Sequence, residues 1–328
     1  MSRPVFVSED SVKQVLAWPA MIAKLREVYA FEHPPFAGPP RTLARGKGIW
    51  MRTLTGVLPS GSVMGTKQFC FPRSKTVRYI ISIFDQESGA LLALLDGRSI
   101  TALRTAATTA VAIDRMAPEG PAVVCMLGSG GEAHSHARAL PAVRPIAEMR
   151  VFSPTQERRE AFARNFTHET GIPCRAVASA REAVEGSTVI VGATRTTNGQ
   201  PVLEGAWLKS GMLVASIGAT LPEHREIDSA TIERSDLIVA DMPDEVMHET
   251  GCFRTAKEEG QRFEQKFVSL NALIAGKVDD RLRDARQPMF RSVGASLQDL
   301  AVAELAYREA LKRGLAVELP MELSVKPD

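Results

Sequence analysis

Between about residue 118 and residue 245, short apolar runs alternate with charged, helix-like segments. The apolar runs are AVVCML, EMRVFS, CRAVAS, STVIVGA, MLVASIG and DLIVAD, and segments such as TQERREAFARNFTHET separate them. Short apolar runs alternating with helices are typical of parallel strands that are buried on both faces of a sheet. The sequence therefore predicts an α/β fold with a doubly wound parallel sheet.

The first of these strands leads into a glycine-rich turn, GSGGEA, and then into a helix-like run. A glycine turn between a strand and a helix lets a pyrophosphate approach the backbone, and the unpaired N–H groups of the helix N-terminus favour an anion. The alternative is a tight turn with no ligand, but the order of strand, turn and helix fits a Rossmann-type dinucleotide site. The residues expected to bind the cofactor are Gly128, Ser129, Gly130, Gly131, Glu132 and Ala133.

The end of the second strand indicates which dinucleotide binds. NAD-binding domains place an acidic residue there, on the ribose 2′-hydroxyl. Glu148 precedes the strand MRVF instead of following it, and the strand ends in SPTQERR. We therefore expect NADP, with NAD as the alternative; the arginines could equally form an ordinary charged helix face. Further cofactor-binding residues expected from strand ends are Ser153, Thr155, Arg158 and Thr194.

The first 100 residues show a different pattern. Four strand candidates, GIWMRTLTGVLP, SVMGTKQFCF, TVRYIISIFD and ALLALLDGRSIT, follow a helical stretch that contains Pro19. Near the C-terminus, SVGASLQDLAVAELAYREALKRGL has helical spacing and ends at Gly314. We expect this helix to pack on the N-terminal part of the chain, which predicts one domain of residues 1–117 plus 292–328 and a second of residues 118–291.

The charge balance and the cysteine and histidine spacing limit the partners, the location and the metal sites that we expect. Lys and Arg number 40 against 38 Asp and Glu, so we expect neither nucleic acid nor a membrane surface as a partner. The four cysteines lack metal or disulfide spacing, and the start of the chain has no apolar signal core, so a cytoplasmic protein is expected. His134 and His136 are two residues apart and would point to different sides of a helix, so no metal site is expected.

Several stretches together resemble the ornithine cyclodeaminase and μ-crystallin family, which includes ketimine reductases and archaeal-type alanine dehydrogenases. The most specific of them is DGRSITALRTAA. The others are PRT at 40–42, MGTK at 64–67, MLGSGGEA at 126–133, PVLEGAWLKSGMLVASIGA at 201–219 and SVGASLQDLAVAELAY at 292–307. The resemblance implies a homodimer whose substrate-binding and dimerisation domain is formed by both chain ends, with a Rossmann domain inserted between them.

The same resemblance implies roles for three basic residues. Arg41 and Arg104 would bind the carboxylate of a small amino or imino acid, and Lys67 would lie beside the reacting carbon. Their chemistry agrees, because a guanidinium matches a carboxylate and a lysine of lowered pKa exchanges protons near neutrality. Considered alone, the arginines could be surface ion pairs and Lys67 a solvated strand residue.

One position departs from the cyclodeaminase pattern. Where ornithine cyclodeaminases have an acidic residue after the fifth Rossmann strand, this chain has Thr220, with Glu223, Glu226 and Asp228 nearby. A threonine cannot act as a carboxylate base, and a small hydroxylic residue before the pattern RE-D looks more like μ-crystallin and the ketimine or pyrroline-carboxylate reductases. The resemblance therefore implies an NAD(P)H-dependent reductase of cyclic or open imine carboxylates, with Lys67 and Thr220 as catalytic residues. The alternatives are an ornithine cyclodeaminase that uses a neighbouring acid, an opine-type amino-acid dehydrogenase, and a binding protein without turnover.

Overall fold

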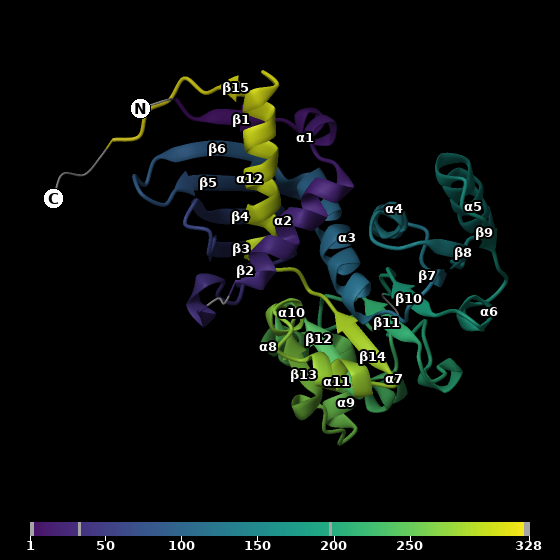
Figure 1. Cartoon of the computed structure of the whole chain (residues 1–328). Coiled ribbons are helices and arrows are strands. Elements are labelled where there is room, and N and C mark those ends of the chain that lie inside the picture. The colour runs from purple at the N-terminus through teal and green to yellow at the C-terminus, as the bar shows by residue number, and fades with distance from the viewer. Residues whose placement is uncertain (1–2, 32–33, 197–198, 325–328) are drawn as a thin grey trace. The chain divides into compact units, whose positions relative to one another are not determined.

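The computed structural model describes residues 3–31, 34–196 and 199–324 (Figure 1). It divides into two compact units, Met1–Thr105 with Ala295–Asp328 (unit 1) and Ala106–Gly294 (unit 2). The first division falls within helix α3 (Gly97–Met116). The functional domains expected from the sequence, 1–117 plus 292–328 and 118–291, stay predictions.

Unit 1 contains a seven-stranded sheet of order β15-β1-β6-β5-β4-β3-β2. All its neighbouring strands are antiparallel except β1 and β6. The strands are β1 (Val5–Val7), β2 (Thr42–Gly46), β3 (Ile49–Val57), β4 (Val63–Phe71), β5 (Arg78–Asp85), β6 (Leu91–Asp96) and β15 (Val317–Glu318). The helices besides α3 are α1 (Glu9–Val15), α2 (Trp18–Ala30) and α12 (Ser296–Lys312).

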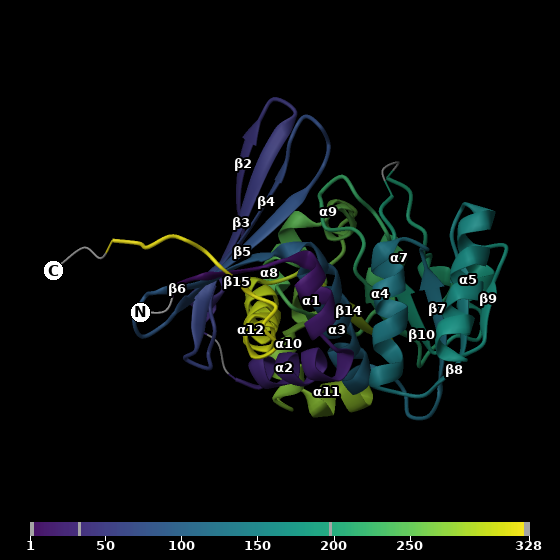
Figure 2. The same ribbon diagram turned by 90° about the horizontal axis from the view of Figure 1, so that it is seen from above.

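Helix α12 packs along one face of this sheet, against β3, β4 and β5. Two glycines that pair across the strands, Gly56 and Gly65, make the close approach possible. A Cβ at either position would lie 3.1 Å from Leu300 of α12. The sequence thus brings its C-terminal helix back to its N-terminal strands; Figure 2 shows α12 nearly end-on beside them.

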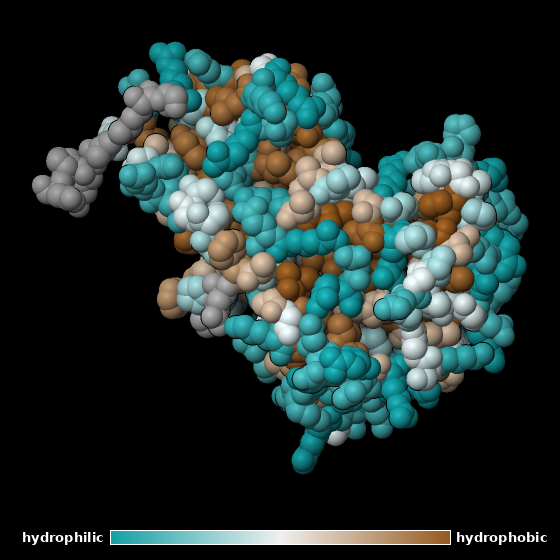
Figure 3. All heavy atoms as spheres, in the orientation of Figure 1, coloured by the Kyte–Doolittle hydropathy of each residue, from teal (hydrophilic) through white to brown (hydrophobic). Residues whose placement is uncertain are grey.

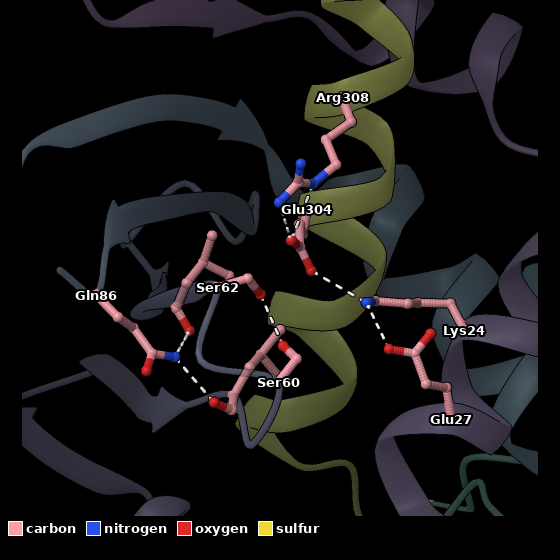
Figure 4. Close-up of polar contacts among 9 residues, drawn as sticks. Lys24, Glu27, Ser60, Ser62, Gln86, Glu304 and Arg308 are labelled. Carbon is pink, nitrogen blue, oxygen red and sulfur yellow. Dashed lines mark hydrogen bonds and ion pairs between the residues drawn. The ribbon is translucent and has the colours of Figure 1, made fainter.

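Ion pairs of a buried glutamate, Glu304, stabilise the packing of α12 (Figure 4). The carboxylate of Glu304 lies 3.2 Å from Lys24 of α2 and 2.7 Å from Arg308, one turn further along α12. Gln86 closes the β3–β4 turn, because its amide donates to the carbonyls of Leu58 and Val63. These contacts fix the helix and the hairpin that the candidate site below depends on.

Two sequence expectations in unit 1 need correction. The predicted fourth strand extends only to Asp96, because α3 starts at Gly97 and the Asp96 carboxylate accepts a hydrogen bond from the N–H of Arg98. The helical stretch with Pro19 is two helices, and Pro19 lies in the first turn of α2, where a proline's missing N–H costs nothing. The strands β1, β2 and β15 were not expected from the sequence.

Unit 2 contains an eight-stranded sheet of order β13-β12-β14-β11-β10-β7-β8-β9, in which every neighbouring pair is parallel. The strands are β7 (Ala122–Leu127), β8 (Ile146–Phe152), β9 (Cys174–Ala176), β10 (Val189–Gly192), β11 (Leu213–Ser216), β12 (Leu237–Ala240), β13 (Phe267–Ser269) and β14 (Pro288–Arg291). Its helices besides α3 are α4 (Gly131–Ala139), α5 (Gln156–Thr170), α6 (Ala180–Val184), α7 (Ser229–Arg234), α8 (Pro243–Glu249), α9 (Gly251–Glu258), α10 (Leu270–Ile274) and α11 (Asp279–Asp284).

This sheet confirms the predicted α/β fold class with a doubly wound parallel sheet. All six apolar runs form strands, and β10, β11 and β12 are buried at every residue. The strand order reverses direction between β7 and β10, and ligands of such sheets bind at the carboxyl ends of the strands at that point. Two strands were not expected from the sequence: β14, which lies between β11 and β12, and β13, which pairs with the other side of β12.

The segment from Phe253 to Gln287 carries an unusual number of charged residues. It forms most of α9, then β13, α10 and α11, and the surface over α9 and α11 is hydrophilic (Figure 3). Along the described ranges of the chain, no helix combines the length and the apolar character needed to cross a membrane.

Candidate active site

The glycine turn of unit 2 follows β7 and opens into α4. Gly128 has a φ of +116°, and a Cβ there would lie 2.6 Å from the carbonyl oxygen of Ala193, so only glycine fits. At Gly130 and Gly131 a Cβ would meet no atom within 4 Å. Gly130 caps α4 without any side-chain hydrogen bond, so the first N–H groups of α4 face an open, glycine-lined turn. This cradle fits a pyrophosphate.

The other members of the motif have distinct positions. Ala133 is fully buried and lets α4 pack on the sheet. The Ser129 hydroxyl donates to Ser153 Oγ over 2.8 Å, which joins the glycine turn to the end of β8. Glu132 lies in the first turn of α4.

The end of β8 presents hydroxyls and guanidinium groups. Thr155 caps α5, Arg158 is exposed on the first turn of that helix, and Arg159 donates from Nη1 to the carbonyl of Ser153 over 2.9 Å. Glu148, in contrast, lies within β8 and pairs with Arg150 at 3.1 Å. The positive charge at this strand end suits a phosphate.

The two histidines of α4 make contacts within the fold of unit 2. His136 is buried, with Nδ1 2.7 Å from the carbonyl of Glu132 and Nε2 3.0 Å from Thr109 Oγ1, and burial lowers its pKa to about 4. The ring of His134 packs on Phe162 with centroids 4.4 Å apart. Within the described residues, no group of three or more His, Cys, Asp and Glu residues could hold a metal ion.

Unit 1 brings Lys67 of β4 and Arg104 of α3 onto one buried carboxylate, Asp299 of α12. Asp299 Oδ2 lies 2.6 Å from Lys67 Nζ, and Asp299 Oδ1 accepts from Arg104 Nε over 2.8 Å. Lys67 is 2% exposed, Arg104 5% and Asp299 0%. Lys67 is therefore not a solvated strand residue, and Arg104 is not a surface ion pair.

The surroundings change the acidity of Lys67. Burial disfavours its charged form, and Arg104 and Arg41 act in the same direction, whereas Asp299 favours the charged form. The net result lowers the pKa of Lys67 to about 7. Near neutrality the ammonium form of Lys67 can therefore give a proton and the amine form can take one.

A further pair of polar residues holds Arg104. Its Nη1 donates to Gln298 Oε1 over 2.7 Å, and Gln298 Nε2 donates to the Tyr29 hydroxyl over 2.7 Å. Gln298 is fully buried and Tyr29 is 1% exposed. The guanidinium of Arg104 is thus fixed by two side chains of α12, and through Gln298 by α2.

Asp299 and Gln298 were not singled out in the sequence. The available signal is the pair QD within the apolar helix ASLQDLAVAELA, since adjacent polar residues on a buried helix need partners. Asp299 also lies in the first turn of α12, where the helix dipole favours a carboxylate.

Thr220 lies in the segment after β11, half-buried. Of the acids that follow it, Glu223 is exposed, and Asp228 caps α7 by accepting from the N–H and hydroxyl of Thr231 and from Gly205 N. Glu226 is fully buried and accepts hydrogen bonds from the ends of β10 and β11. The carboxylates of Asp228 and Glu226 therefore accept hydrogen bonds that hold the local fold.

Comparison with known proteins identifies the relatives of this chain. The model of the ornithine cyclodeaminase/mu-crystallin family matches residues 65–314. The chain belongs to this family. The resemblance predicted from its motifs is thereby confirmed.

Individual family members are similar over most of their length. A Delta(1)-pyrroline-2-carboxylate reductase of Bacillus cereus is 30% identical over 243 residues, 74% of this chain and 74% of that protein. The ketimine reductase mu-crystallin of Rattus norvegicus is 30% identical over 322 residues, 93% of this chain and 96% of that protein. The structure of Thermococcus litoralis Delta(1)-pyrroline-2-carboxylate reductase in complex with NADH and L-proline has a TM-score of 0.87 at 26% identity, and the match covers 96% of this chain and 100% of that one.

Proposed function

We propose that this family member is an NAD(P)H-dependent oxidoreductase that reduces cyclic or open imine carboxylates, as Δ1-pyrroline-2-carboxylate and ketimine reductases do. The observation that carries the proposal is the buried Lys67, whose pKa is about 7 and which shares Asp299 with Arg104. The names of the relatives in Bacillus cereus and Rattus norvegicus, and the NADH complex from Thermococcus litoralis, support it.

Arg104 and Arg41 are proposed to bind the substrate carboxylate. The guanidinium of Arg104 is held in one orientation by Asp299 and Gln298, so little side-chain entropy is lost when an anion binds. Arg41 precedes β2 and lies close enough to Lys67 to influence its pKa. A second guanidinium of this kind would give the carboxylate two charged partners.

Lys67 is proposed to supply the proton of the reaction. Reduction of a C=N bond to an amine needs one hydride on carbon and one proton on nitrogen. The reduced nicotinamide, when bound, supplies the hydride. Lys67 holds the proton on Nζ, and its lowered pKa makes transfer to the imine nitrogen favourable near pH 7. Asp299 keeps Nζ in place through the 2.6 Å contact.

For the cofactor we propose a preference for NADPH over NADH. Ser153, Thr155 and Arg158 surround the end of β8, where they would bind a 2′-phosphate, and Arg159 keeps the Ser153 carbonyl in place. The glycine turn from Gly128 to Gly131 would hold the pyrophosphate. Thr194 follows β10, which pairs with β7 in the sheet.

Thr220 is proposed as a hydrogen-bonding residue of the same reaction. The ornithine cyclodeaminase alternative needs an acid to replace the one missing at Thr220. Of the acids that follow, Glu223 is exposed, Glu226 accepts hydrogen bonds at both carboxylate oxygens, and Asp228 accepts three at Oδ1. This geometry favours imine reduction over loss of ammonia.

A homodimer is proposed through the sheet face of unit 1 opposite α12. Apolar side chains on that face stay exposed, with Met51 at 45%, Val57 at 41% and Ile80 at 41%. The proposed contact would cover these side chains. Light scattering of the purified protein measures the mass, and a monomer would contradict the proposal.

The first test of function is a fluorescence titration with NADPH and NADH, with and without Δ1-pyrroline-2-carboxylate, while cofactor absorbance is followed in the same sample. We expect oxidation that depends on the imine and is faster with NADPH. Cofactor binding without oxidation across a panel of cyclic and open imine carboxylates would contradict the proposed reaction.

A further inference from the structure

Glu226 is a fully buried carboxylate that accepts hydrogen bonds from backbone N–H groups and from two hydroxyls. Its Oε1 accepts from the N–H of Thr194 over 2.6 Å and from the hydroxyl of Thr194 over 3.0 Å. Its Oε2 accepts from Ser216 Oγ over 2.7 Å, Ile217 N over 3.0 Å and Gly218 N over 3.1 Å. One side chain therefore joins the segments that leave β10 and β11.

Neighbouring glycines show how closely this carboxylate is enclosed. A Cβ at Gly192 would lie 2.7 Å from the carboxyl carbon of Glu226, and a Cβ at Gly218 would overlap the backbone of Thr194. Arg291, fully buried on β14, holds the same segment from the other side by donating to the carbonyls of Ser216 and Ala219. The position of the β11 exit is thus determined by buried hydrogen bonds.

These two strand exits lie on one side of the point where the strand order reverses. The glycine turn after β7 would hold the pyrophosphate, and the end of β8 would bind the adenosine ribose. The nicotinamide half of a bound dinucleotide would then extend in the opposite direction, over the ends of β10 and β11. Glu226 itself is buried beneath these backbone segments and acts on a cofactor only through them.

We propose that Glu226 is a positioning residue for the nicotinamide half of the bound cofactor, because it fixes the backbone at Thr194 and Gly218. The proposal rests on cofactor binding by unit 2 and not on the nature of the imine substrate. A glutamine at this position would turn an amide N–H toward one of the two sets of donors, so the exits of β10 and β11 would separate.

The test compares two ligands that differ only in nicotinamide. Calorimetric titrations would measure Kd for NADPH and for 2′-phospho-ADP-ribose in the wild type and in Glu226→Gln. We expect the Kd of NADPH to rise about tenfold or more, since charge-assisted hydrogen bonds are lost, while that of 2′-phospho-ADP-ribose changes less than about threefold. Asp228→Asn is the matched control: it removes a carboxylate two residues away that caps α7, and the ratio of the two Kd values should stay at the wild-type value.

A second variant tests the same proposal in case Glu226→Gln does not fold. Ser216→Ala removes only the hydroxyl that donates to Glu226 Oε2, and Ser216 is fully buried, so it reaches a cofactor only through Glu226. It should shift the ratio of the Kd values in the same direction by a smaller factor. An unchanged ratio in the folded variants, or equal weakening of both ligands, would overturn the proposal. A wild type that binds NADPH but reduces no imine would contradict only the proposed reaction.

Discussion

Two buried carboxylates, one in each unit, have opposite surroundings. Asp299 in unit 1 lies between the ammonium of Lys67 and the guanidinium of Arg104. Glu226 in unit 2 accepts hydrogen bonds from backbone N–H groups and from two hydroxyls. Both carboxylates are fully buried, so burial alone does not distinguish them.

The difference lies in what the partners can do. A lysine of lowered pKa exchanges its proton with a substrate, so the group around Asp299 can change charge during a reaction. Backbone N–H groups do not titrate, so the group around Glu226 keeps one arrangement. Buried charge among titratable side chains indicates chemistry, and buried charge among backbone dipoles indicates a fixed framework.

The largest expected effect is that of Lys67→Met. Removing the proton donor should lower kcat for imine reduction by about 10²- to 10⁴-fold and leave the Kd of NADPH unchanged. Steady-state kinetics and fluorescence titration measure the two quantities. Lys24→Met is the control, since Lys24 pairs with Glu304 of the same helix α12. Unchanged turnover in Lys67→Met would favour the binding protein without turnover.

A smaller effect is expected from Arg104→Ala. Loss of a charge-assisted contact of about 1.5–3 kcal/mol should raise KM for the imine carboxylate roughly 10- to 150-fold. Initial rates at varied imine concentration measure it. Arg308→Ala removes an exposed guanidinium that pairs with Glu304, and it should leave KM unchanged. Equal KM values in Arg104→Ala and Arg308→Ala would show that Arg104 does not bind the substrate.

The smallest effect is expected from Asp299→Asn, and it is a shift in the pH dependence of kcat/KM. In the wild type, kcat/KM for reduction should decline above pH about 7, because Lys67 loses the proton it donates. Asp299 favours charged Lys67, so its removal lowers the pKa of Lys67 further and moves this decline to lower pH. A pH profile of kcat/KM measures the shift.

Two controls test whether this shift belongs to Asp299. Glu304→Gln, another buried acid of α12 paired with a lysine, should leave the profile in place, and so should Glu226→Gln. A profile that moves equally in all three variants would show that the two carboxylates do not differ as argued above.

The elements of unit 2 could be predicted because their signals are local. Six apolar runs became six strands, and the glycine turn from Gly128 to Gly131 lies between β7 and the first turn of α4. Apolar runs bounded by turn residues carry this information within a few positions. The strands β13 and β14 were missed because each is short and lies among charged or loop-like residues.

The candidate site of unit 1 could be predicted only in part. The family resemblance assigned roles to Arg41, Lys67 and Arg104. Asp299 lies within another of the family stretches, at 292–307, but was assigned no role, and it is distant in sequence from all three. Glu226 was considered as a substitute acid, whereas its hydrogen bonds depend on backbone N–H groups of two other segments. Partners that meet only in the folded chain leave little trace in a single sequence.

Because unit 1 is formed by two segments that flank unit 2, its site is assembled only after unit 2 has been made. More than two hundred residues separate Lys67 from Asp299, so at about 5–20 residues per second the ribosome makes the carboxylate roughly 10 to 50 seconds after the lysine. Unit 2 is one continuous segment and is complete by then. The strands that carry Lys67 therefore wait, without their helix α12, until the whole of unit 2 has been made.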